Sequence, residues 1–82
     1  MALAYTYLKY KDVHTIENQE VVPLQYSISK VTCDTVTVVS TGTILAGTTF
    51  TLNFKVDGIY RVTLTHSITS ETETLPDIFY YF

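Results

Sequence analysis

The sequence has no tryptophan, only one cysteine and few basic residues, and each shortage excludes a class of protein. With Cys33 alone, the chain can form no intramolecular disulfide and no zinc cluster built from thiolates. A single unpaired thiol also fits a chain that folds in a reducing compartment. Five basic and eight acidic residues give a net charge of -3, and the basic residues are dispersed. Because nucleic-acid binding depends on neutralising phosphates, no nucleic-acid partner is expected.

Long hydrophobic runs and glycine-rich loops are also missing. No stretch approaches the roughly 18 consecutive apolar residues of a membrane span, and the first residues lack a charged region followed by a long apolar run. We therefore expect no membrane partner and synthesis in the cytoplasm. The three glycines match no phosphate-binding spacing, so a nucleotide cofactor is not expected either.

What the sequence does contain is β-forming residues. Threonine, valine, isoleucine and tyrosine are abundant, whereas alanine, glutamate and lysine are scarce. At 82 residues and 46% hydrophobic, the chain has room and apolar material for one core. Residues 1–82 are thus predicted to form a single all-β domain. Turn signals every ten residues or so favour antiparallel strands in a sandwich or small barrel.

The clearest alternation runs from residue 50 to residue 64. The side chains predicted to face the core are Phe50, Leu52, Phe54, Val56, Tyr60, Val62 and Leu64, with His66 at the rim. Lys55 is predicted to face the opposite side. Shorter alternating runs predict strands around residues 24–28 and 35–38, with a bulge or tight turn between Lys30 and Asp34. Residues 43–46 form either a minor edge strand or a packed loop.

Two terminal strands complete the predicted set. One covers residues 3–10 and the other residues 71–80, where Pro76 is expected to end or bend the strand because it cannot donate a ladder hydrogen bond. Glu71 and Glu73 alternate with threonines in this closing strand. Charged residues on a terminal strand commonly prevent edge-to-edge aggregation, and we assign them that role rather than a catalytic one.

Residues 50–64, FTLNFKVDGIYRVTL, resemble the E strand, corner and F strand of immunoglobulin-like domains. The resemblance implies that Asp57 and Gly58 turn the chain between two sheets, while Tyr60 packs inward and its hydroxyl bonds upstream backbone. Val62 stands where antibody domains have their second cysteine, so their disulfide core is excluded. For the same residues, Asp-Gly between two alternating runs also predicts an ordinary hairpin, and both interpretations stay open.

Short immunoglobulin-like domains without cysteine pairs, with a similar aromatic-x-x-Asp-Gly-x-Tyr-x-Val pattern, occur in virion proteins of tailed bacteriophages, and this chain resembles them. The resemblance implies an immunoglobulin-like antiparallel β-sandwich of about seven strands. It further implies a non-enzymatic structural module of a virion, one that attaches to or decorates a capsid, fibre or tail. Its partners would be other virion proteins or further copies of itself.

Residues able to do chemistry are few and scattered. Asp12 and His14 are two potential metal ligands without an evident third. Cys33 lacks a cationic neighbour that would activate it, so we expect an inert thiol that a core position could accommodate. No nucleophile, base and orienting group stand together, and neither an enzyme nor a bound cofactor or metal is expected.

The chain ends are the predicted site of function. The candidate interface residues are Tyr5, Tyr7, Ile78, Phe79, Tyr80, Tyr81 and Phe82. Aromatic residues of this kind are favoured in protein interfaces, although they could instead complete a small core. An alternative function is a carbohydrate- or receptor-binding adhesion module, in which exposed tyrosines stack on sugar rings and bind glycans weakly.

Replacement of Tyr60 by phenylalanine tests the corner interpretation. Tyr60→Phe is expected to lower the free energy of unfolding by about 1 kcal/mol, because one hydrogen bond to backbone is lost. The value is measured by denaturant titration of both proteins. An unchanged midpoint would favour the hairpin.

Overall fold

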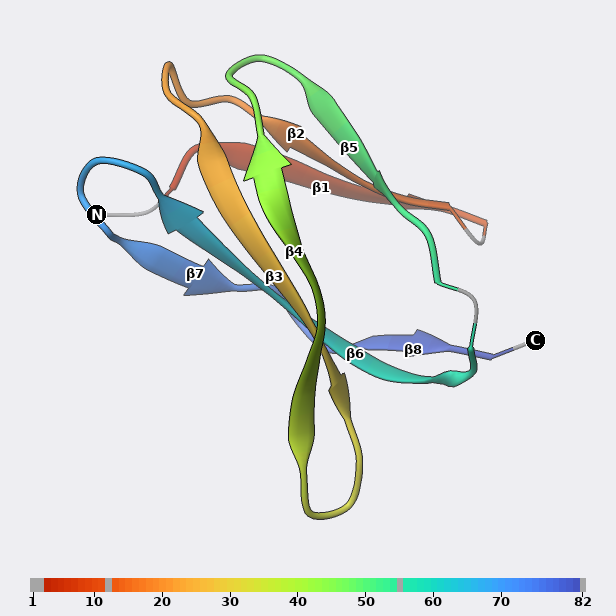
Figure 1. The fold of residues 1–82 in the computed structure, drawn as a ribbon. Coiled ribbons are helices and arrows are strands. Elements are labelled where there is room, and N and C mark those ends of the chain that lie inside the picture. The colour runs from red at the N-terminus through yellow and green to blue at the C-terminus, as the bar shows by residue number, and fades with distance from the viewer. Residues whose placement is uncertain (1–2, 12, 55, 82) are drawn as a thin grey trace.

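The protein consists of two antiparallel β-sheets packed together, in a computed structural model that describes residues 3–11, 13–54 and 56–81 (Figure 1). Sheet A contains β1 (Tyr5–Tyr10), β2 (Val13–Asn18) and β5 (Thr49–Leu52), in the order β1-β2-β5. Sheet B contains β4 (Val36–Ile44), β3 (Leu24–Val31), β6 (Gly58–His66) and β7 (Thr72–Thr74), in that order, and β8 (Ile78–Tyr80) also pairs with β6. No helix occurs among the described residues. The prediction of an all-β, two-layer antiparallel fold is confirmed.

Strands β7 and β8 lie one after the other along the same edge of β6. β7 pairs with the segment of β6 around Leu64, and β8 pairs with the segment around Ile59. Between them the Leu75 amide still donates to the carbonyl of Val62, at 2.9 Å. Pro76 follows and has no N–H to donate, so the ladder breaks there as predicted. The described residues form eight strand segments, where about seven strands were expected. β2 was not predicted, β7 and β8 were predicted as one strand, and Thr43 and Ile44 end β4 and do not form a strand of their own.

The hairpin of β3 and β4 contains both the predicted turn and an unpredicted bulge. Residues 32–35 form the turn, in which the Thr32 amide donates to the carbonyl of Thr35 at 2.8 Å. On β4, Ser40 pairs with Ile28 and Val38 pairs with Ser29, so Val39 is an extra residue. Because side chains alternate along a strand, one extra residue reverses the faces beyond it.

The bulge therefore decides where the valines of β4 point. Without it, Val36 and Val38 would share the inner face with Ile44. With it, both point out of the sandwich and are 51% and 57% exposed. The strand was predicted, but its valines make no contribution to the core. Figure 1 shows this half of the hairpin extending beyond the other strands.

The core lies between the two sheets and receives side chains from both. Its buried apolar side chains are Leu3, Ile16, Leu24, Ile28, Ile44, Leu52, Tyr60, Val62, Leu64, Leu75 and Ile78. Of the side chains predicted to face inward from residues 50–64, Phe50 and Phe54 pack against this core while partly exposed. The prediction is wrong for Val56, which is exposed because β5 ends at Leu52 and Val56 lies in the connection beyond the sheet. Lys55 lies outside the described residues.

The connection from β5 to β6 carries the chain from one sheet to the other. β5 belongs to sheet A and β6 to sheet B, so the chain turns a corner between layers here and does not form a hairpin. The Tyr60 hydroxyl donates to the carbonyl of Val56 at 2.6 Å, and the Tyr60 ring stacks on Phe54 with centroids 4.3 Å apart. Burial raises the pKa of Tyr60, and the nearby Asp57 and Tyr80 add to that effect.

Asn18 is a fully buried amide at the end of β2, and its side chain joins three segments. Its Nδ2 donates to the carbonyls of Val22 and Ile44, both at 2.9 Å, and its Oδ1 accepts from the Glu20 amide at 2.8 Å. The backbone of Asn18 also bonds to Gly47 and Thr48. A buried amide satisfied in this way fixes the loop after β2 against the end of β4.

Removal of this amide should destabilise the fold. Asn18→Ala is expected to lower the free energy of unfolding by about 3 kcal/mol, because it leaves buried backbone groups without partners. Chemical denaturation monitored by tyrosine fluorescence gives the value. The control is Asn53→Ala, at an exposed asparagine, which should stay within about 0.5 kcal/mol of the parent. Equal effects of the two substitutions would contradict the role assigned to Asn18.

Candidate functional site

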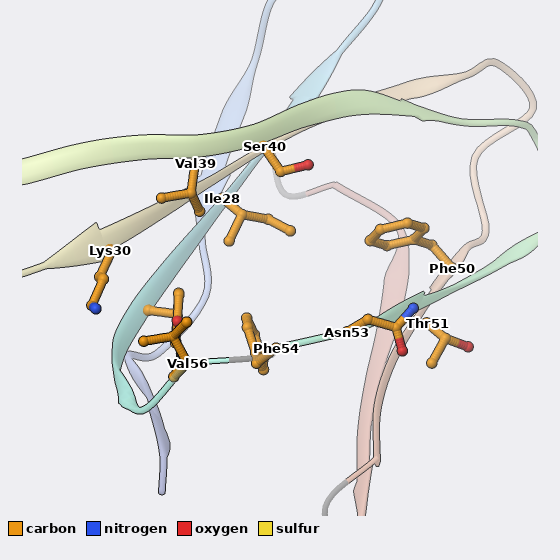
Figure 2. Close-up of a pocket in the computed structure, with 10 residues that line it drawn as sticks. Ile28, Lys30, Val39, Ser40, Phe50, Thr51, Asn53, Phe54 and Val56 are labelled. Carbon is orange, nitrogen blue, oxygen red and sulfur yellow. Dashed lines mark hydrogen bonds between the residues drawn. The ribbon is translucent and has the colours of Figure 1, made fainter.

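A groove opens into the core between strands β4 and β5 (Figure 2). Its volume is about 560 Å³. The lining residues are Ile28, Lys30, Val39, Ser40, Phe50, Thr51, Asn53, Phe54, Val56 and Tyr60. Ile28 and Tyr60 are buried residues of the core, so a ligand in the groove can contact core side chains.

The groove is open because no strand covers this flank of the sandwich. β4 is an edge strand of sheet B and β5 an edge strand of sheet A, and neither has a further neighbour on this side among the described residues. A short turn joins them, closed by the Thr48 amide and hydroxyl, which donate to the carbonyl of Leu45 at 3.1 and 2.7 Å. Two strand edges therefore flank an apolar opening.

An aromatic stack holds one wall of the groove. Tyr26 of β3 and Phe50 of β5 lie with their ring centroids 4.4 Å apart and their planes 26° from parallel. Gly42, the partner of Tyr26 on β4, gives the ring its space: a Cβ there would lie 2.5 Å from the Tyr26 hydroxyl oxygen. Glycine at this position thus lets the tyrosine lie across the strand and support Phe50.

A second aromatic group holds the other end. Phe54 stacks on Tyr60, and its centroid lies 5.5 Å from that of Tyr80 and 5.7 Å from that of His14. His14 is buried, and its Nδ1 is in hydrogen-bonding contact with the Tyr7 hydroxyl at 2.6 Å. Burial raises the pKa of Tyr7. The two phenylalanines of the groove are therefore fixed by neighbours on several strands.

Lys30 is the one charged residue among the described residues that line the groove. Its aliphatic stem lies against Gly58, where a Cβ would be 2.8 Å from Lys30 Cε. No carboxylate of the described residues forms an ion pair with it. The groove is thus apolar with one positive group (Figure 2).

A second exposed apolar surface lies on the outer face of sheet B. Strand register places Phe79 beside Ile59, Ile59 beside Val31, and Val31 beside Val36. We call this surface the outer apolar row. Besides Val31, Val36, Ile59 and Phe79 it includes Val38, two residues after Val36 on β4, and the exposed Tyr81, two residues after Phe79 and just beyond β8. Phe79 and Tyr81 are each 62% exposed. The exposed Arg61–Asp77 ion pair, at 3.1 Å, borders the row.

The residues predicted as an interface at the chain ends are divided by the structure. Ile78 is buried, and Tyr5, Tyr7 and Tyr80 pack against the core. The exposed members are Phe79 and Tyr81, and Phe82 lies outside the described residues. The outer apolar row also includes residues that sequence reasoning missed, namely Val31, Val36, Val38 and Ile59. Their proximity follows from strand pairing, which the sequence did not reveal.

The residues considered for chemistry lie apart from one another. Asp12, the predicted companion of His14, lies outside the described residues. His66 lies at the rim, as predicted, and its Nδ1 accepts hydrogen bonds from the amides of Ile68 and Thr69 at 3.2 and 3.1 Å. Cys33 is exposed in the turn of the β3–β4 hairpin, so a core position is wrong. Within the described part of the chain, no three metal-ligating side chains come together.

Glu73 belongs to β7, an edge strand, and Tyr5 packs close to it from sheet A. Burial raises the pKa of Tyr5, and a hydrogen bond to Glu73 and the negative charge of that carboxylate raise it further. Strand register pairs Glu73 with the buried Leu64, so both side chains lie on the inner face of sheet B. An inward-pointing charge on an edge strand opposes pairing with another chain.

Comparison with known proteins gave no relative: family models, curated proteins and solved structures were searched, and none matched this chain. Among the described residues, no helix is long and apolar enough to span a membrane.

The packing of Tyr26 on Gly42 can be tested by a double-mutant cycle. Gly42→Ala should lower the free energy of unfolding by about 2 kcal/mol, because the added methyl group displaces the ring. In a Tyr26→Ala background the same substitution should cost about 0 kcal/mol, since the space is then free. Thermal and chemical denaturation measure both, with Thr41→Ala, at an exposed neighbour, as the control. Equal costs in the two backgrounds would show that the ring is not what excludes a side chain.

Proposed function

We propose that this chain is a non-enzymatic, immunoglobulin-like module that attaches to another protein in the virion of a tailed bacteriophage. One support is the strand order. If β1, β2 and β5 are taken as strands A, B and E, then β3, β6 and the split β7–β8 edge correspond to C, F and G, and β4 to C′. The Tyr60 hydrogen bond at the corner before β6 is a further support. The attribution to a virion rests on the resemblance of residues 50–64.

The observation that carries the proposal is the outer apolar row. Monomeric proteins rarely leave a contiguous apolar surface in water without a use for it, and aromatic residues are enriched where proteins meet. Here the exposed Phe79 and Tyr81 lie at one edge of sheet B, and Ile59 and Val31 connect Phe79 across the sheet to the exposed Val36 at the other edge. Such a surface suits a lasting contact with another virion protein or with a further copy of the chain.

Carbohydrate binding is the alternative function, and the arrangement of the tyrosines gives it less support. A sugar-binding platform needs exposed rings that are close together. Tyr10 and Tyr81 are strongly exposed, but Tyr10 belongs to a strand of sheet A, whereas Tyr81 follows the last strand of sheet B. Retention on a glycan array that is lost in Tyr10→Ala or Tyr81→Ala would favour this alternative.

The proposed function predicts that the protein enters virus particles through the outer apolar row. A labelled copy is supplied while the phage that encodes the chain is produced, and its amount in purified particles is measured by quantitative mass spectrometry. The double variant Phe79→Ser with Tyr81→Ser should be reduced at least tenfold, because the apolar contact is lost. Ile68→Ser, at an equally exposed residue in the turn after β6, is the control and should enter normally. Absence of the parent protein from particles would refute the proposal.

A further inference from the structure

We propose that the groove between β4 and β5 binds an extended segment of a partner protein, which adds as a strand beside β5. Apolar side chains on one face of the segment would enter the groove, and a carboxylate would reach Lys30. This inference deepens the proposed function and rests on it, because it gives the chemistry of the partner at a second surface.

The main chain of β5 favours a strand as the occupant. On one side β5 pairs with β2, and on its other side it has no neighbour among the described residues. An exposed strand edge presents a row of N–H and C=O groups that another extended chain can pair with. In immunoglobulin-like domains of the constant type, strand D occupies the position beside strand E. With β5 taken as strand E, the groove lies where that missing strand would run.

The side chains beside this edge determine which residues the bound segment must have. Ile28 and Tyr60 lie at the core side of the groove, and Phe50, Phe54 and Val39 line it from the flanking segments. Because alternate side chains of a strand point to the same face, the segment needs apolar residues at every second position and can be polar at the others. A lipid or other small apolar ligand would fill the groove but leave the strand edge unpaired.

The charge of Lys30 further limits which segments can bind. Lys30 lies in the lining, Gly58 contacts its stem, and no described carboxylate pairs with it. A segment that covered the groove would remove water from this ammonium group, which is unfavourable unless an opposite charge comes with the segment. An acidic residue near one end of the segment meets that need, whereas a basic one would be repelled.

The test uses a defined peptide as the partner segment. The probe is a fluorescent synthetic peptide of about eight residues, in which valine alternates with threonine and one end carries glutamate, and it spans ~26 Å when extended. A second peptide carries lysine in place of the glutamate. Fluorescence anisotropy gives the dissociation constants, and amide chemical shifts identify the strand that the peptide contacts.

Val38 and Val39 supply a matched pair of variants. They are adjacent on β4 and 57% and 54% exposed, but Val39 lines the groove and Val38 belongs to the outer apolar row. Val39→Glu should weaken binding of the glutamate peptide at least tenfold, because it introduces a like charge into the groove, and Val38→Glu should leave binding unchanged. Lys30→Glu should reverse the preference, so that the lysine peptide binds more tightly than the glutamate peptide. The amide shifts should centre on β5.

Several outcomes would overturn the inference. These are no saturable binding of the glutamate peptide, equal effects of Val38→Glu and Val39→Glu, a preference for charge that Lys30→Glu does not alter, or amide shifts confined to sheet B. Sedimentation without peptide provides one more: a dimer that Val39→Glu dissociates would identify a second copy as the occupant. A parent protein that enters particles but fails these assays overturns the groove inference alone. One that never enters particles refutes the proposed function, whatever the peptide does.

Discussion

Two crossings between the sheets, both close to β5, are the constraint on which the rest of the structure depends. The chain leaves sheet B at the end of β4, contributes four residues to sheet A as β5, and returns to sheet B at β6. A strand this short has few ladder hydrogen bonds of its own. Side chains tie both crossings to backbone: Asn18 bonds to the carbonyl of Ile44 before β5, and Tyr60 bonds to that of Val56 after it.

The same crossings explain why the groove exists. A chain that turns directly from β4 into β5 places no strand over the flank between them, so Phe50 and Phe54, which pack against the core, stay partly exposed there. The other long edges of the sandwich carry residues that oppose pairing with another chain. Lys9 belongs to β1, Pro76 interrupts the β7–β8 edge, and Glu73 points inward on β7. By contrast, β4 and β5 carry no ionisable residue along their lengths. The edges beside the groove thus lack the charged residues and the proline of the other edges, and only the bulge of β4 and the shortness of β5 limit their pairing.

How much of this could be foreseen depends on whether a residue's environment is local. The faces of Leu52, Tyr60, Val62 and Leu64 followed from alternation, because period two is a property of one strand. The burial of Asn18 did not, since its partners belong to residues 22 and 44 and an isolated asparagine normally indicates a turn. The groove was equally hidden, because it depends on which strands end their sheets. No pattern within one segment encodes that.

Val39 shows that one extra residue can matter as much as the identity of the side chains around it. Because this extra residue reverses the faces of β4, Val36 and Val38 point toward solvent, and Thr37 points to the inner face beside its pairing partner Lys30. Deletion of the Val39 codon would remove the bulge and keep this arrangement, because Val38 would then adjoin Ser40 and still pair with Ser29 on the outer face. A slip of the pairing by one residue, by contrast, would close the bulge with the same residues, turn Val36 and Val38 inward and Thr37 outward, and replace an apolar outer surface by a polar one without any substitution.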